Sequence, residues 1–256
     1  MRTRHRVGLM ATALALVAAG CASESDGDGD GAAPGDGGDD TDLEVLDDPR
    51  SDAERESDEA AADEAVLTLD DMPAGWTEGP AVDDENDTLR GQLADCIGID
   101  RDVLDPDNPE ARSPELTSPG GEQVRAEVAY SASPDHAGQA FAILARDETP
   151  GCYAEALSTA MADVAETGQL EEGVEVGEVS FERLSFPDMG DESTAFRVTI
   201  PLSVPGFEVE LLADIAAVRV GRVVASGTFL SELQPFDTDE AADLMATMVD
   251  RIPADA

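Results

Sequence analysis

The chain contains no lysine. All of its 15 basic residues are arginine, against 58 acidic residues, and the formal net charge is -43. The sequence therefore has no lysine for a Walker-type phosphate loop, a Schiff base or a general base. The excess of negative charge also opposes binding to DNA or RNA, which requires a basic patch, and close approach to anionic lipid headgroups. We therefore expect no nucleic-acid partner.

Histidine and aromatic residues are also scarce. One histidine, His136, lies in the part of the chain that we expect to fold, so no site with two histidine ligands can form there. The hydrolase motif G-x-S-x-G is absent. Aromatic residues make up 4% of the chain, which leaves few platforms for a sugar. We predict no catalytic residue, no metal ligand and no cofactor. A carboxylate-dependent hydrolase is the enzymatic alternative, because two suitably spaced acids are sufficient for that chemistry.

Residues 1–20 have the layout of a secretory signal peptide. Three arginines precede the apolar run 7–20, which is too short to span a bilayer. The run ends in Ala-Ala-Gly followed by Cys21, which resembles the lipobox of bacterial lipoproteins. This resemblance implies that Cys21 becomes the lipidated first residue of a mature, membrane-anchored protein, with palmitate among its acyl chains. Ordinary secretion, with cleavage near Ala22, is the alternative.

The chain from Cys21 to residue 64 is predicted to be an acidic, disordered tether. It is rich in Asp, Glu, Gly and Ala and has no aromatic residue, so it cannot bury enough apolar surface to offset its ordering entropy. Residues 26–31 match the opening D-x-D-x-D-G of a calcium loop, but the twelfth position is Gly37 instead of glutamate. We therefore expect no specific calcium site. The tether would hold the domain away from the membrane.

Residues 65–256 are predicted to form one α+β domain, an antiparallel sheet of about five strands packed with helices. Alternating apolar residues indicate strands near 124–130, 174–181, 196–202, 207–215 and 223–230. Short turns join the later strands, which favours antiparallel pairing, and the helices are segregated from them. Helices are expected to begin at Ser133, Thr149 and Asp237.

Two details of the strand pattern carry further expectations. Arg125 and Glu127 alternate with apolar residues, which predicts that one face of this strand is wet. The apolar phase changes between residues 174–176 and 179–181. A β-bulge near Gly177 would repair that change.

Two cysteines, Cys96 and Cys152, lie in the predicted domain. In an exported domain we expect them to form a disulfide, which would stabilise the fold by about 4 kcal/mol in the chain-entropy model. Two free, buried thiols are the alternative. Trp76, which follows a Pro-Ala-Gly turn, is the candidate that we name for a ligand contact. A packing role in the core or at the sheet edge is the alternative for Trp76.

Several short motifs, taken together, resemble those of a known group of proteins. They are Leu-Asp-Asp-Met-Pro-Ala-Gly-Trp at 69–76, Ala-Asp-Cys-Ile-Gly at 94–98, a helix carrying Cys152, Gly-Asp-Glu at 190–192 and Val-Arg-Val-Gly-Arg-Val-Val at 218–224. In this order they resemble actinobacterial surface lipoproteins and the extracytoplasmic sensor-like domain of PknH-type receptor kinases. The resemblance covers about residues 66–252. It implies an α+β domain with a cleft, placed outside the cytoplasm, with a sensing role and no catalytic residues. The sequence departs from the kinase pattern in having one candidate disulfide where that domain has two.

The sequence therefore predicts a membrane-anchored extracytoplasmic lipoprotein that binds or senses a ligand without catalysis. The partner would be a small molecule, a lipid or an envelope protein. A structural or protein-interaction lipoprotein of the cell envelope is the alternative; an exposed apolar patch without a pocket would favour it.

Overall fold

The computed structural model describes residues 48–79, 87–104, 107–166, 174–204, 207–232 and 234–254. The predicted signal peptide, Cys21, the calcium-like motif at 26–31 and the tether up to residue 47 lie outside the described residues. Among the helices of the described part, none combines the length and the apolar character that crossing a membrane requires.

Helices and strands occur in separate runs along the chain, which is an α+β order. The helices are α1 (Asp52–Ala65), the 3-10 turn η1 (Leu69–Asp71), α2 (Asp87–Ile97), α3 (Arg101–Leu104), α4 (Pro134–Ala145), α5 (Thr149–Glu166) and α6 (Thr238–Arg251). The strands are β1 (Thr77–Glu78), β2 (Glu110–Arg112), β3 (Leu116–Thr117), β4 (Gln123–Tyr130), β5 (Glu175–Val176), β6 (Ser180–Arg183), β7 (Glu192–Val204), β8 (Phe207–Val220) and β9 (Val223–Glu232).

All the strands pair antiparallel in one sheet. Its order is β1-β3-β4-β9-β8-β7-β5, with β2 beside β4 and β6 beside β7. The α+β class and the antiparallel pairing are therefore confirmed. The predicted number of strands was too low, because the described sheet has nine. The short strands β1, β2 and β3 carry two or three residues each, too few to show an alternating pattern.

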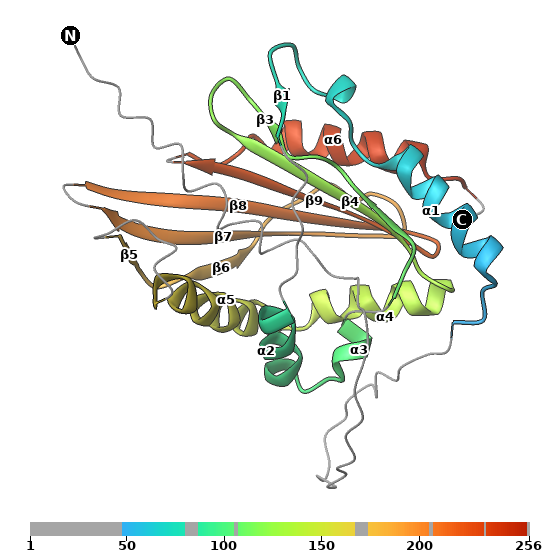
Figure 1. Cartoon of the computed structure of the whole chain (residues 1–256), viewed down its shortest axis with the longest axis horizontal. Helices are drawn as coiled ribbons and strands as arrows, with labels where there is room; N and C mark the ends of the chain where they lie inside the picture. The colour runs from blue at the N-terminus through green and yellow to red at the C-terminus, as the bar shows by residue number, and fades with distance from the viewer. Residues whose placement is uncertain are drawn as a thin grey trace, which may run out of the picture.

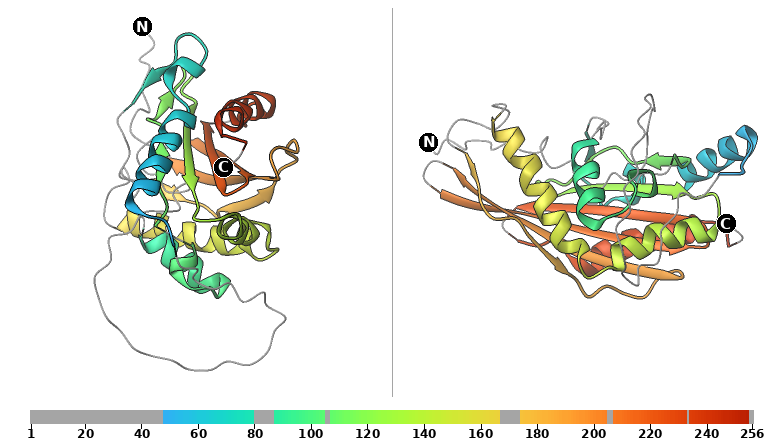
Figure 2. Two further views of the ribbon diagram at one scale, coloured as in Figure 1. Left: turned by 90° about the vertical axis from the view of Figure 1, so that its right-hand side faces the viewer. Right: turned by 90° about the horizontal axis from the view of Figure 1, so that it is seen from below.

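Helices cover both faces of the sheet (Figure 1). On one face, α1 and α6 pack against apolar side chains of β4, β8 and β9, among them Val128, Val218 and Phe229. We call this the α1/α6 face. On the other, α4 and α5 cross the long strands, as the view from below shows (Figure 2). There Leu157 and Met161 of α5 pack on Val198 and Ile200 of β7. We call this the α4/α5 face.

The predicted tether extends too far along the chain, because its last part is folded. Helix α1 occupies residues 52–65 and begins with a capping box in which Ser51 and Glu54 satisfy each other's backbone N–H groups. Its residues Ala62 and Ala65 are fully buried in the core. The composition misled because small alanines, not large apolar residues, pack this helix against the sheet.

A buried ion pair attaches α1 to the β8–β9 hairpin. Asp58 of α1 is 6% exposed, and both its carboxylate oxygens accept hydrogen bonds from Arg222 at 2.6 and 2.7 Å. Arg50 donates to the same carboxylate at 3.1 Å. Burial opposes ionisation of Asp58, but these hydrogen bonds outweigh it and hold the pKa of its carboxyl below the usual value. The partners are far apart in the sequence, so local pattern could not reveal them.

Most of the predicted long elements are confirmed. Ser133 caps α4 and Asp237 caps α6, each through its side chain. The β8–β9 hairpin turns at Gly221 with φ +56°. The predicted bulge is also present: Val176 pairs with Leu202, but Ser180 pairs with Thr199, so the first strand holds one extra residue between these pairs.

Candidate functional site: a polar strip on the helix-covered sheet

Five polar side chains share the α4/α5 face at the β4 side of the sheet. By register, Glu127 of β4 pairs with Arg112 of β2, and Arg125 of β4 pairs with Thr228 of β9. Glu110 lies two residues before Arg112, on the same face. We call Glu110, Arg112, Arg125, Glu127 and Thr228 the polar strip.

The β4 residues of the polar strip are buried, contrary to the prediction that this face of the strand is exposed to solvent. Arg125 and Glu127 are each 8% exposed, and Thr228 is 2% exposed. Strand alternation fixes which side chains share a face but does not show whether a helix covers them. Here helices cover the face, and ion pairs make burial of the charged groups possible.

Arg112 joins the two carboxylates of the strip. Its Nη2 lies 2.7 Å from Glu110 Oε1, and its Nε donates to Glu127 Oε2 at 3.0 Å. Burial raises the pKa of Glu127 well above its usual value, and the charge of Glu110 adds to this rise. The positive charges of Arg112 and of Arg90, on α2, oppose it. The net result favours the protonated, neutral form of Glu127.

Arg125 and Thr228 have buried side-chain atoms that make no hydrogen bond in the described structure. Arg125 Nη2 donates to Glu115 Oε2 at 2.5 Å, but its Nε and Nη1 are buried and meet no partner in the described structure. The hydroxyl of Thr228, directly across the strand pair, is likewise buried and without a partner there. Buried donors of this kind are rare in folded proteins, where water, an ion or a ligand usually completes them.

An open groove of 360 Å³ reaches the strip at Glu110. The N-terminal half of α1 and the start of β2 form its walls, and its lining is Asp52, Arg55, Glu56, Glu59, Asn108, Pro109 and Glu110. Most of these side chains are acidic or polar. Among the described residues, this groove lies at the edge of the sheet.

The structure places Trp76 in the core, apart from the polar strip. Its side chain is 9% exposed and belongs to the cluster that α1 and α6 form with the sheet. This position matches the packing alternative. His136 lies in the first turn of α4, with its Nδ1 2.7 Å from the Oγ of the capping residue Ser133.

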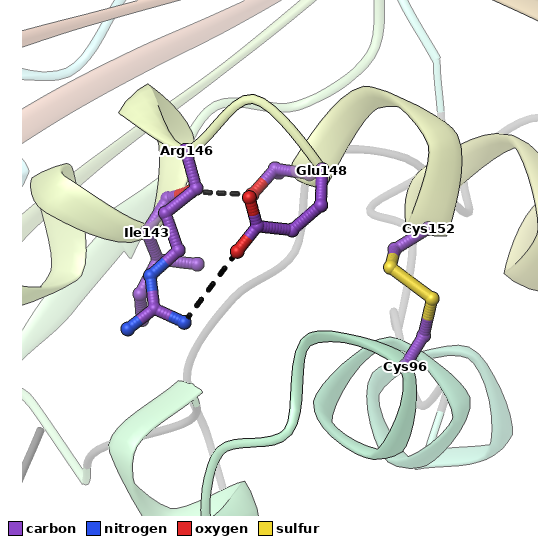
Figure 3. The surroundings of a disulfide bond; sticks show 6 residues. Cys96, Ile143, Arg146, Glu148 and Cys152 are labelled. Carbon is purple, nitrogen blue, oxygen red and sulfur yellow. Dashed lines mark hydrogen bonds and ion pairs between the residues drawn. A yellow bond between two sulfur atoms is a disulfide. The ribbon is translucent and has the colours of Figure 1, made fainter. Parts of the chain in front are cut away.

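The predicted disulfide is confirmed. Cys96 of α2 is bonded to Cys152 of α5, with 5.6 Å between their Cα atoms (Figure 3). The bond adjoins a small cluster in which Leu93, Ile97 and Ile143 are buried. It holds α2 against the helices of the α4/α5 face.

Sequence reasoning missed the polar strip as a site. The alternation of Arg125 and Glu127 with apolar residues was visible, but it is typical of a solvated strand face. No signal pointed to Thr228. Among the described residues, no group of three potential metal ligands occurs.

The chain matches no family model and no curated protein. Among solved structures it is similar to the extracellular domain of PknH from Mycobacterium tuberculosis, known from a crystal structure. The two are 11% identical, the match covers 76% of this chain and 95% of that one, and the TM-score is 0.38. At these values the match does not assign the chain to a family, and the chemistry of the polar strip rests on the strip's own residues.

Proposed function

We propose that the protein is an extracytoplasmic binding module, anchored by a lipid on Cys21, that holds a small molecule without transforming it. The location is supported by the Cys96–Cys152 disulfide, because such bonds persist in oxidising compartments. The signal-like residues 1–20 and the lipobox-like approach to Cys21 agree with it.

The observation that carries the binding function is the pair of buried, unpartnered polar groups on Arg125 and Thr228. An unsatisfied buried donor costs about 1–3 kcal/mol. A bound molecule that supplies the missing acceptors would recover this free energy, which is the physical basis of a specific polar site.

Two features favour ligand binding over a flat docking face. The groove beside Glu110 is hollow and polar. Among the described residues, the one large hydrophobic side chain that is exposed is Phe207, at 54%. A single exposed side chain is no extended apolar patch, which an apolar protein-docking surface would require.

The carboxylates of the strip fit a binding role better than hydrolysis. A hydrolase needs two carboxyl groups that face the substrate from either side. Glu127 is buried beside Arg112, and the two acids share this one arginine. Because Glu127 is buried and bonded to Arg112, its carboxyl group is not accessible to a substrate.

The test is native mass spectrometry of the full protein, released gently from its own membranes. We expect extra mass that is lost on denaturation, from the bound molecule, and extra covalent mass that survives denaturation, from the lipid. Cys21→Ala is the control for the lipid and should remove the covalent mass only. A protein that carries no dissociable mass would contradict the binding function.

A further inference from the structure

The two cysteines of the disulfide differ in their access to solvent. Cys96 is exposed, whereas Cys152 is 5% exposed and belongs to the small buried cluster with Leu93, Ile97 and Ile143. A thiolate breaks a disulfide by attacking one sulfur from the side opposite the sulfur that leaves. For Cys96 that approach starts at the surface of α2, but for Cys152 it starts within the buried cluster. An attacking thiol therefore reaches Cys96 more easily.

The helix ends that carry the two cysteines favour the same direction of attack. Cys152 lies in the first turn of α5, where its backbone N–H donates to the carbonyl oxygen of Glu148 at 3.0 Å. Cys96 is the second-last residue of α2. A helix dipole favours negative charge at the N-terminus and disfavours it at the C-terminus. The carboxylate of Glu148 points toward Arg146, at 3.9 Å (Figure 3). Charge released by cleavage is thus better placed on Cys152.

We propose that Cys96 is a modification site at which a small external thiol enters the disulfide. The thiolate sulfur forms a new S–S bond to Cys96 while the bond between Cys96 and Cys152 breaks. The electron pair of the broken bond goes to the sulfur of Cys152, which takes up the proton that the attacking thiol has lost. One disulfide replaces another, so the exchange needs no further oxidant or reductant.

This exchange would change how α2 is attached to the rest of the domain. The disulfide is a covalent cross-link between α2 and α5. After exchange, α2 would be held by packing alone, through Leu89 on the α4/α5 face and through Leu93 and Ile97 in the smaller cluster. The thiol of Cys152 would remain beneath Cys96 and could attack the mixed disulfide to restore the original bond. The modification is therefore reversible, and ligand binding plays no part in it.

Mercaptoethanol, a neutral thiol, is the probe for this site. The full protein in detergent is exposed to it briefly, and excess N-ethylmaleimide with urea in mild acid then stops the exchange and caps all free thiols. Cleavage after arginine places the two cysteines on separate peptides, 91–101 and 147–183, for mass spectrometry. At early times we expect the mercaptoethanol adduct about tenfold or more often on Cys96 than on Cys152, which should carry maleimide instead.

The dependence on urea shows whether the folded protein reacts. The rate of exchange should rise in proportion to the thiol concentration and should stay constant at urea concentrations below the unfolding transition. A rate that rises with urea in step with the unfolded fraction would overturn the proposal, because the bond would then react only after unfolding. An adduct mainly on Cys152, or equal adducts on the two cysteines, would overturn it as well.

The single variants Cys152→Ser and Cys96→Ser form a matched pair in which one thiol remains. The oxidised, disulfide form of mercaptoethanol should convert the Cys96 thiol to a mixed disulfide about tenfold or more faster than the Cys152 thiol, because only the former is exposed. Equal rates in two folded variants would contradict the assignment of Cys96. Where a variant fails to fold, the peptide map of wild type decides.

Discussion

At the scale of single residues, Cys96 and Cys152 determine how α2 is held. We expect the double variant Cys96→Ser/Cys152→Ser to lose about 2–5 kcal/mol of unfolding free energy, because the unfolded chain is no longer constrained. Urea unfolding with and without reductant measures this loss. Reductant should destabilise wild type and leave the variant unchanged. A variant as stable as oxidised wild type would show that the bond contributes nothing.

Glu127 gives a pH dependence with a definite sign. Its pKa is raised in the folded protein above the unfolded value of 4.5, so the folded state holds a proton more tightly than the unfolded state. Its contribution to stability therefore falls as the pH rises from the unfolded pKa toward the folded one. Glu127→Gln keeps an acceptor for Arg112 and carries no charge. The stability of this variant should decrease less with rising pH than that of wild type. At about pH 8 the variant should be as stable as wild type or more stable.

The measurement is thermal unfolding as a function of pH. Glu192→Gln serves as the control, because Glu192 pairs with Arg219 at the surface with 48% of its side chain exposed. It should keep the wild-type slope. A steeper decline with pH in Glu127→Gln than in wild type would contradict the buried, protonated state of Glu127.

At the scale of elements, α1 distinguishes a folded N-terminal segment from a tether. Ser51 caps α1 with its side chain, so Ser51→Ala should cost about 0.5–2 kcal/mol. Ser57→Ala changes a solvent-exposed residue in the middle of the same helix. It should be neutral or slightly stabilising, because alanine is the better helix former. Opposite signs for these two substitutions, measured by urea unfolding, are expected for a helix. Two null effects would indicate that α1 contributes nothing to the fold.

The elements that could be predicted are those whose partners lie close in the sequence. The strands β7, β8 and β9 are ten residues or longer, carry alternating apolar residues over part of that length, and follow each other through short turns. The N-cap residues Ser133 and Asp237 mark the starts of α4 and α6 in the sequence. By contrast, α1 depends on Arg222, which follows Asp58 by 164 residues. Its one local signal is the Ser51–Glu54 capping box, which lies in an acid-rich segment.

At the scale of the whole molecule, the net charge of -43 determines how stability depends on salt. Self-repulsion of this size destabilises a compact state, and salt screens it. We expect the melting temperature to rise with sodium chloride between about 0.01 and 0.5 M and then to level off, as the screening length approaches a few ångströms. The rise should shrink near pH 4, where many carboxylates are protonated. A melting temperature that falls with added salt at neutral pH would contradict this account.

The candidate site is likewise a property of the whole molecule. The sequence predicted the disulfide and correctly offered a packing role for Trp76, because both depend on residue type. It did not predict the polar strip. Arg125 and Thr228 are distant in sequence, and they become a buried pair only when β4 joins β9 and helices cover that face.

The Cys96–Cys152 bond also turns the intervening chain into a closed ring that contains β2, β3, β4 and α4. A single protease cut inside this ring opens it without releasing a piece. The nicked molecule migrates as one species until reductant separates its halves, and β4 stays hydrogen-bonded to β9 meanwhile. A cut outside the ring leaves no disulfide between the two fragments. The part of the chain that carries Arg112, Arg125 and Glu127 is therefore the part best protected against loss by proteolysis.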